Sequence, residues 1–115
     1  MNIDYISRVS LSRALRWHPE GLHSWSLSDW FTAYAGEVGE LGNVIKKLNR
    51  ARDGMVGNKE TPAQLQDAMG KEIADCYLYL DLLAQAAGVN LSEAIQKKFN
   101  EVSERNGFPE RLGTE

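Results

Sequence analysis

Two long stretches of the chain carry apolar residues at spacings of three and four, and this period restricts the fold more than any other feature. It matches the 3.6-residue turn of an α-helix and gives each stretch an apolar stripe. The first stripe contains Leu27, Phe31, Tyr34, Val38, Leu41, Ile45 and Leu48, and the second contains Leu65, Met69, Ile73, Cys76, Leu80, Leu83 and Ala87. No segment shows the alternation with a period of two that a strand requires. The chain is therefore predicted to be all-α.

Helix-start signals set the order of the elements. A small polar residue followed three positions later by Asp, Glu or Gln is typical of a helix N-terminus. Such pairs are Ser26 with Asp29, Thr61 with Gln64, and Asn90 with Glu93. Apolar periodicity also predicts a short helix over residues 4–16, and residues 110–115 are expected to form a frayed tail. We expect one domain, residues 1–115, built as an antiparallel helical bundle of two long helices with shorter N- and C-terminal helices.

Net charge, cysteine content and hydropathy indicate which partners and which cellular compartment to expect. The net charge of −3 argues against nucleic acid as the main ligand. Cys76 is the single cysteine, so no disulfide forms within the chain, which suits a reducing cytoplasm. No apolar run approaches the roughly 18 residues that a membrane span needs, and the first residues lack a signal-peptide pattern. A cytoplasmic location without membrane contact is expected.

Two pairs of acids lie beside the apolar stripes. Glu37 and Glu40 belong to the first long helix, and Glu72 and Asp75 to the second. Residues at i and i+3 lie about 60° apart on a helix, so packing of the two helices would bring four carboxylates together. Their mutual repulsion would call for a cation, and all-oxygen ligands favour Mg²⁺, with Mn²⁺ as an option. The alternative is that the acids only form a solvated helix face.

These acids also carry a family resemblance. The segment 36–41, Gly-Glu-Val-Gly-Glu-Leu, followed by Lys-Glu-Ile-Ala-Asp at 71–75, resembles the MazG-like all-α nucleotide pyrophosphohydrolase superfamily, whose signature is ExxE and then ExxD. Further resemblance lies in Arg16-Trp17 and in Lys98-Phe99-Asn100. The chain looks most like the small stand-alone members, including those encoded by phages. The resemblance implies Mg²⁺-dependent cleavage of nucleoside triphosphates between the α- and β-phosphates, which yields a monophosphate and pyrophosphate.

The same resemblance implies residue roles. The four acids, Glu37, Glu40, Glu72 and Asp75, would be catalytic and bind the metal. One of them would accept a proton from water, with Glu40 as the first guess. The substrate-binding candidates are Lys98 and Lys47 for phosphates, Asn100 for phosphate, sugar or a metal-bound water, Trp17 and His18 for base or sugar, and Tyr79 for the pocket wall. Trp17 and Trp30 could instead be core or interface aromatics, and Tyr79 could merely pack.

Two other functions use helical bundles of this kind. A di-iron bundle needs Glu-x-x-His pairs, but both histidines lie within residues 17–25, so it is set aside. A non-catalytic module that binds a nucleotide or a partner helix would keep the stripes without needing four acids. In either case the short helices could not cover both stripes, so a homo-oligomer, a dimer or a tetramer, is expected to complete a four-helix core. Tyr77, Leu78 and Asp81 point away from the second stripe, and Asp81 is expected to face solvent or to lie at a subunit contact.

Overall fold

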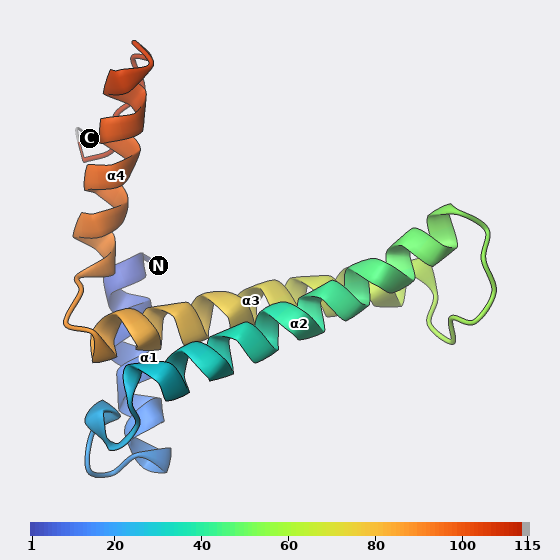
Figure 1. Ribbon diagram of the computed structural model, residues 1–115, viewed down its shortest axis with the longest axis horizontal. Helices are drawn as coiled ribbons and strands as arrows, with labels where there is room; N and C mark the ends of the chain where they lie inside the picture. The colour runs from blue at the N-terminus through green and yellow to red at the C-terminus, as the bar shows by residue number, and fades with distance from the viewer. Residues whose placement is uncertain (114–115) are drawn as a thin grey trace. The chain divides into compact units, whose positions relative to one another are not determined.

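The computed structural model describes residues 1–113, and within them it contains four α-helices, one short 3₁₀ helix and no strand. The elements are α1 (Ile3–Trp17), η1 (Leu22–Ser24), α2 (Leu27–Arg52), α3 (Pro62–Ala86) and α4 (Leu91–Arg105) (Figure 1). The all-α prediction is confirmed. The chain divides into two compact units. One comprises residues 1–24 together with the chain from Ala84 onward, and the other comprises Trp25–Leu83.

Side-chain caps fix where the helices begin, as the sequence predicted. At the start of α2 the Asp29 N–H donates to Ser26 Oγ (3.1 Å), and the Ser26 N–H donates to Asp29 Oδ2 (2.9 Å). Thr61 and Gln64 exchange the same pair of hydrogen bonds before α3. Each reciprocal pair satisfies two N–H groups that a helix terminus otherwise leaves without partners.

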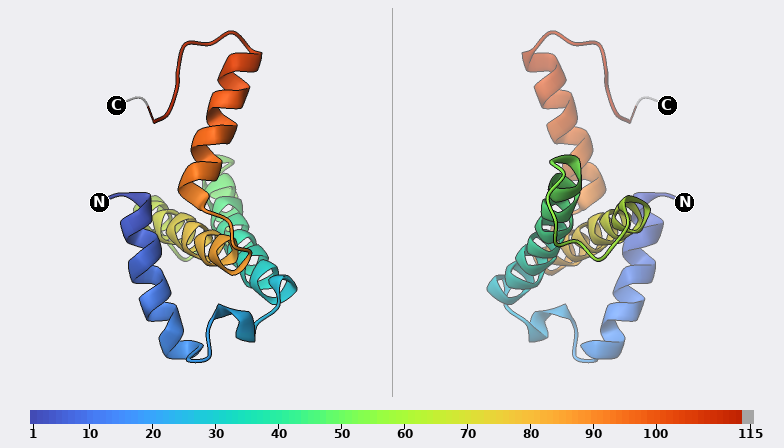
Figure 2. Two further views of the ribbon diagram at one scale, coloured as in Figure 1. Left: turned by 90° about the vertical axis from the view of Figure 1, so that its left-hand side faces the viewer. Right: turned by 90° about the vertical axis from the view of Figure 1, so that its right-hand side faces the viewer.

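Helices α2 and α3 run antiparallel, side by side (Figures 1 and 2). Their less exposed residues recur at spacings of four and three, which marks the seam along which the two helices pack. The seam residues of α2 are Trp30, Tyr34, Glu37, Leu41, Val44 and Leu48, and those of α3 are Leu65, Met69, Glu72, Cys76, Tyr79 and Leu83. Each seam therefore contains one glutamate at a position that would ordinarily hold an apolar residue.

The seam only partly coincides with the predicted stripes. Four residues of the predicted α2 stripe, Leu27, Phe31, Val38 and Ile45, are 53%, 57%, 43% and 41% exposed. On α3, Ile73 and Leu80 are also exposed. Two apolar stripes overlap on α2, sharing Tyr34, Leu41 and Leu48. The partner helix covers the stripe that includes Trp30, which is 1% exposed, and leaves the other stripe bare.

The uncovered apolar residues lie together on one side of the hairpin. Val38 follows the seam residue Glu37, and Ile73 follows the seam residue Glu72. A step of one residue turns a side chain by about 100° about its helix axis, and antiparallel axes turn the two steps to the same side. The hairpin therefore has an exposed apolar face, which consists of Phe31, Val38, Ile45, Ile73 and Leu80.

The connection between α2 and α3 is tied to the end of α2. Lys47 Nζ pairs with Glu60 Oε2 at 2.6 Å, and Asn58 Nδ2 donates to the Lys47 carbonyl at 2.7 Å. Gly54, with φ of 69°, lets the chain leave the helix, and the Met55 N–H then donates to the Arg50 carbonyl at 2.9 Å. The ion pair and these hydrogen bonds thus hold the connection against the C-terminal end of α2.

The other compact unit contains α1, α4 and the end of α3. Gln85 Nε2 donates to the Ser7 carbonyl at 3.0 Å, which joins α3 to α1. The small residues Ser10, Ala14 and Ser103 are buried in this unit. The prediction of a frayed tail is wrong for residues 110–113, because the chain folds back on α4, where Leu112 hydrogen-bonds Asn100. Residues 114 and 115, the rest of that predicted tail, lie outside the described residues.

The expected position of Asp81, at solvent or at a subunit contact, is also wrong. It lies neither at solvent nor at an exposed subunit contact, since its exposure is 0%. A single acid within an apolar run has the same sequence signature whether it faces outward or inward, so the pattern could not decide.

None of the helices in residues 1–113 combines the length and the hydropathy needed to cross a bilayer.

Candidate metal centre

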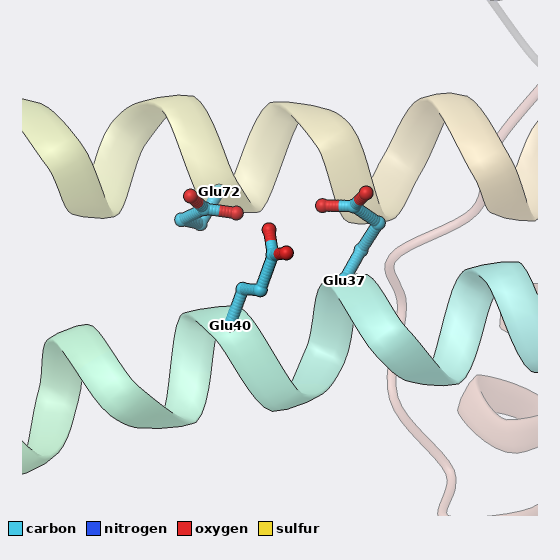
Figure 3. Close-up of side chains that lie close together, drawn as sticks. All are labelled: Glu37, Glu40 and Glu72. Atoms are coloured by element: carbon cyan, nitrogen blue, oxygen red, sulfur yellow. The ribbon is translucent and has the colours of Figure 1, made fainter.

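Three of the four predicted acids converge between α2 and α3. One carboxylate oxygen from each of Glu37, Glu40 and Glu72 lies within 4.8 Å of the others. Glu37 and Glu40 project from successive turns of α2, and Glu72 reaches toward them from α3 (Figure 3). All three belong to the same compact unit. The i,i+3 spacing and the antiparallel pairing of the helices together produce this cluster.

Two of these carboxylates are partly withdrawn from water. Glu37 and Glu72 are half-buried, and the Oε2 atom of each is shielded from solvent without a hydrogen-bond donor. A buried carboxylate oxygen without a partner is costly, and native proteins rarely leave one so. Glu40 is exposed. The cluster therefore has a shielded part along the seam and an open side at Glu40.

The pKa values of the two half-buried carboxyl groups, Glu37 and Glu72, are both raised. Burial raises the pKa of Glu37, and the negative charges of Glu40, Asp75 and Glu72 raise it further. Burial also raises the pKa of Glu72, again with contributions from Glu40 and Asp75. Without a counter-charge, these two carboxyl groups hold their protons more tightly than ordinary glutamates do. A cation bound among them would reverse that preference.

Asp75 lies at the edge of the cluster. It is exposed, and its oxygens are not among those that lie within 4.8 Å of one another. Its charge nevertheless contributes to the raised pKa values of Glu37 and Glu72, so it lies near both. The aspartate side chain is one methylene shorter than glutamate, which accounts for its shorter reach. The predicted role of Asp75 as a metal ligand stays a prediction.

Cys76 is a neighbour of the cluster that sequence reasoning did not place there. Burial raises the pKa of its thiol, and Glu37, Glu72 and Asp75 raise it further. The thiol therefore stays protonated, which fits the expected packing role and disfavours a nucleophilic thiolate. Its position one turn after Glu72, at i+4, is the signal that could have indicated its proximity. Tyr79, one turn further along, is half-buried at the seam.

Lys47 already has an anionic partner. Its ammonium group pairs with Glu60, and this hydrogen bond lowers the pKa of the Glu60 carboxyl group. Lys47 lies two turns beyond Glu40 on α2. Contact between Lys47 and a phosphate stays a prediction, and such a contact would have to compete with Glu60.

Four other predicted site residues belong to the unit that contains α1 and α4. Trp17, at the end of α1, is 70% exposed, and the Arg13 guanidinium lies 5.9 Å from its ring centroid. This exposure excludes the alternative that Trp17 is a core residue of this chain. For Trp30 the same alternative is confirmed, because Trp30 is buried in the core. His18 Nδ1 lies 3.0 Å from Ser24 Oγ across the loop after α1.

Lys98 and Asn100 lie on different faces of α4. Two residues along a helix correspond to about 200°, so their side chains diverge. Lys98 is exposed and lies 3.4 Å from Glu101. Asn100 uses both atoms of its amide group to hold the backbone of Leu112. The structure therefore does not bring the side chains of Lys98 and Asn100, both predicted to bind substrate, to one place.

The donor set of the cluster suits a hard divalent cation. All the candidate ligand atoms of Glu37, Glu40 and Glu72 are carboxylate oxygens, the atoms that Mg²⁺ and Mn²⁺ prefer. Three side chains leave coordination positions for water or phosphate, as is usual for Mg²⁺ at phosphoryl-transfer sites. The two shielded, unpartnered oxygens give a second reason why the site fits a cation.

Comparison with known proteins finds a relative encoded by a phage. No family model matches the chain. The chain is 31% identical over 70 residues to the Gene 37 protein of Mycobacterium phage L5, and the match covers 61% of this chain and 57% of that protein. The chain thus matches less than two thirds of its relative's length. That name denotes a gene number and no activity, so the functional argument rests on the residues of the site.

Proposed function

We propose that the protein is a Mg²⁺-dependent nucleoside triphosphate pyrophosphohydrolase of the MazG-like type, which cleaves between the α- and β-phosphates. The observation that carries this proposal is the convergence of Glu37, Glu40 and Glu72, with two carboxylate oxygens shielded and unpartnered. The ExxE and ExxD spacing supports the same assignment through the resemblance to that superfamily. The products are a nucleoside monophosphate and pyrophosphate.

The residues of the cluster have separable roles in this reaction. When bound, Mg²⁺ would supply positive charge that offsets the charge of the phosphates. Glu37 and Glu72, fixed at the helix seam, would hold the cation. Glu40, on the open side, is suited to accept a proton from the attacking water, and Asp75 at the rim adds negative charge that favours cation binding.

Substrate contacts outside the cluster follow from the resemblance. Lys98 supplies positive charge for the phosphates, Trp17 a stacking surface, and His18 and Asn100 hydrogen bonds. The 70% exposure of Trp17 supports a role in contact with a ligand or a partner. Lys47 and Tyr79, on the hairpin that carries the acids, complete the set.

A homo-oligomer, dimer or tetramer, is part of this proposal. The exposed apolar face of the hairpin supports it, because its residues repeat at intervals of seven on each helix. A second copy of the hairpin would offer the same repeat and would complete a four-helix core by pairing the two faces. Burial of five large apolar side chains per subunit would drive the association.

A coupled assay that detects pyrophosphate tests the proposed function. Each common NTP and dNTP is supplied with Mg²⁺, and at least one should release pyrophosphate. Glu37→Gln should abolish the release, whereas Asp67→Asn should not. Asp67 is an exposed acid of the same helix as Glu72, and it pairs with Lys71 on the surface. Absence of pyrophosphate with every nucleotide would favour the non-catalytic module.

A further inference from the structure

The segment after α4, residues 107–113, forms an ordered strap on that helix. Gly107, with φ of 71°, ends the helix, and the Phe108 N–H donates to the Ser103 carbonyl at 2.8 Å. Arg111 Nη1 donates to the Phe108 and Glu110 carbonyls at 2.6 and 2.9 Å, which fixes the turn of the strap. The strap then runs back along α4 to Asn100 (Figure 2).

Asn100 grips the strap through a two-point contact with one residue. Asn100 Nδ2 donates to the Leu112 carbonyl at 3.0 Å, and the Leu112 N–H donates to Asn100 Oδ1 at 2.8 Å. The carboxamide thus pairs with a neighbouring donor and acceptor. An asparagine carboxamide makes the same bidentate pairing with the donor–acceptor edge of a nucleobase. Leu112 therefore presents Asn100 with the hydrogen-bonding pattern of a base.

The surroundings of Asn100 favour a base over a phosphate as its alternative partner. A hollow of about 570 Å³ lies along this face of α4, and its lining includes Asn100 and Lys97. Glu93, Glu101 and Glu104 also line it, so the face carries more acids than cations. Acidic side chains repel phosphate groups, whereas a neutral base with donors and acceptors is not repelled.

The end of the strap lies close to α4. A Cβ atom added at Gly113 would collide with the carboxamide of Gln96, and Gly113 has φ of +85°. The backbone conformation favours glycine at this position, whereas the exposed Gln96 side chain could move away from an added Cβ atom. The closed strap thus depends on Gly113 and on the backbone of Leu112, and neither contributes a side-chain group to Asn100.

We propose that this strap is a built-in competitor of the substrate, which holds Asn100 by imitating a nucleobase edge and must leave before the base binds there. This inference rests on the proposed function, in which Asn100 contacts the nucleotide. The apparent affinity for nucleotide is then reduced by the fraction of molecules whose strap is closed. Release of the strap should raise that affinity and leave the phosphate contacts unchanged.

Three variants test whether the strap competes with the nucleobase for Asn100. Leu112→Pro removes the N–H that donates to Asn100, and Gly113→Ala strains the backbone of the strap end, which has φ of +85°, while both keep Asn100 intact. Leu112→Ala is the matched control, because it shortens the side chain but keeps both backbone groups. Circular dichroism checks that each variant keeps its helices. Calorimetry then measures the binding of an α,β-methylene nucleoside triphosphate and of tripolyphosphate, with Mg²⁺.

Leu112→Pro and Gly113→Ala should bind the nucleotide analogue about fivefold more tightly than the wild type, as expected for a closed strap that loses one ordinary hydrogen bond. Leu112→Ala should resemble the wild type, and tripolyphosphate should bind all four proteins alike. Unchanged or weaker nucleotide binding by the two release variants would overturn the competitor, even in an active enzyme. A wild type that neither binds nor hydrolyses any nucleotide would instead overturn the proposed function, and the competitor with it.

Discussion

Glu37 of α2 and Glu72 of α3 lie on facing helices of one hairpin, about one helical turn apart along the seam, and each keeps a carboxylate oxygen away from water without a donor. Glu72 lies across from Glu40 (Figure 3). Apolar residues at these positions would pack the hairpin better, so the acids cost stability in the metal-free protein. Stabilities below the optimum are common where a site needs strained or repelling groups.

Neutralising single acids should separate activity from folding. Glu37→Gln, Glu40→Gln and Glu72→Gln should each lower kcat/KM by about 10²–10³-fold, the usual effect of removing one contact to transition-state charge. The helical circular dichroism spectrum should persist, because each change relieves repulsion. Asp75→Asn should have a smaller effect if Asp75 acts only from the rim. Full activity in all of these variants would exclude the cluster as the catalytic site.

The stability of the metal-free protein should depend on pH through Glu37. Its pKa in the folded protein is raised above the ordinary 4.5, so the folded state binds more protons than the unfolded state over the interval between the two values. The contribution of Glu37 is therefore full below about pH 4.5 and is lost as the pH rises through the raised pKa. Urea unfolding in EDTA should show Glu37→Gln gaining stability relative to the wild type as the pH rises above 4.5. A constant difference across that range would contradict the raised pKa.

Mg²⁺ should stabilise the folded protein without any nucleotide. A ligand that binds only the folded state adds about 2.7 kcal/mol when present at 100 times its Kd, which should raise Tm by several degrees. Differential scanning fluorimetry with MgCl₂, against NaCl of equal ionic strength, measures the effect. Glu72→Gln should reduce the shift, whereas Asp67→Asn should keep it. Equal shifts with both salts would mean that the cluster binds no Mg²⁺.

Much of this arrangement could be predicted from the sequence, because it depends on local rules. Ser26 and Thr61 mark their helix starts through hydrogen bonds to residues three positions away, and such bonds need no tertiary information. The acid pairs follow equally from helical geometry. Once two antiparallel helices are expected to pack, the two acid pairs can be placed on facing sides of the hairpin.

Other features depend on tertiary choices that a periodic pattern does not contain. Phe31 and Trp30 each belong to an apolar stripe of α2, and only the packing of α3 decides which one is buried. The partner of Lys47 is Glu60, thirteen residues away in an irregular loop. The strap residue Leu112 is held through its backbone, which gives no side-chain signal, so its contact with Asn100 could not be predicted.

The exposed apolar face should mediate self-association. Sedimentation equilibrium at micromolar concentration should give a mass at least twice the 12.9 kDa of one chain. Val38→Glu and Ile45→Glu place charges within the face and should shift the protein toward the monomer. Asn43→Glu, at an exposed polar position of the same helix, is the control. A wild type that sediments as an active monomer would contradict the oligomer.

The position of bond cleavage tests the central claim most directly. The protein is incubated with Mg²⁺ and its best nucleotide in H₂¹⁸O, and the products are followed by ³¹P NMR and mass spectrometry. Attack of water on the α-phosphorus predicts nucleoside monophosphate that carries ¹⁸O, unlabelled pyrophosphate and no diphosphate, with the reaction abolished by Glu37→Gln. Nucleoside diphosphate with orthophosphate, or turnover that survives the substitution, would contradict a pyrophosphohydrolase built on the cluster of Glu37, Glu40 and Glu72.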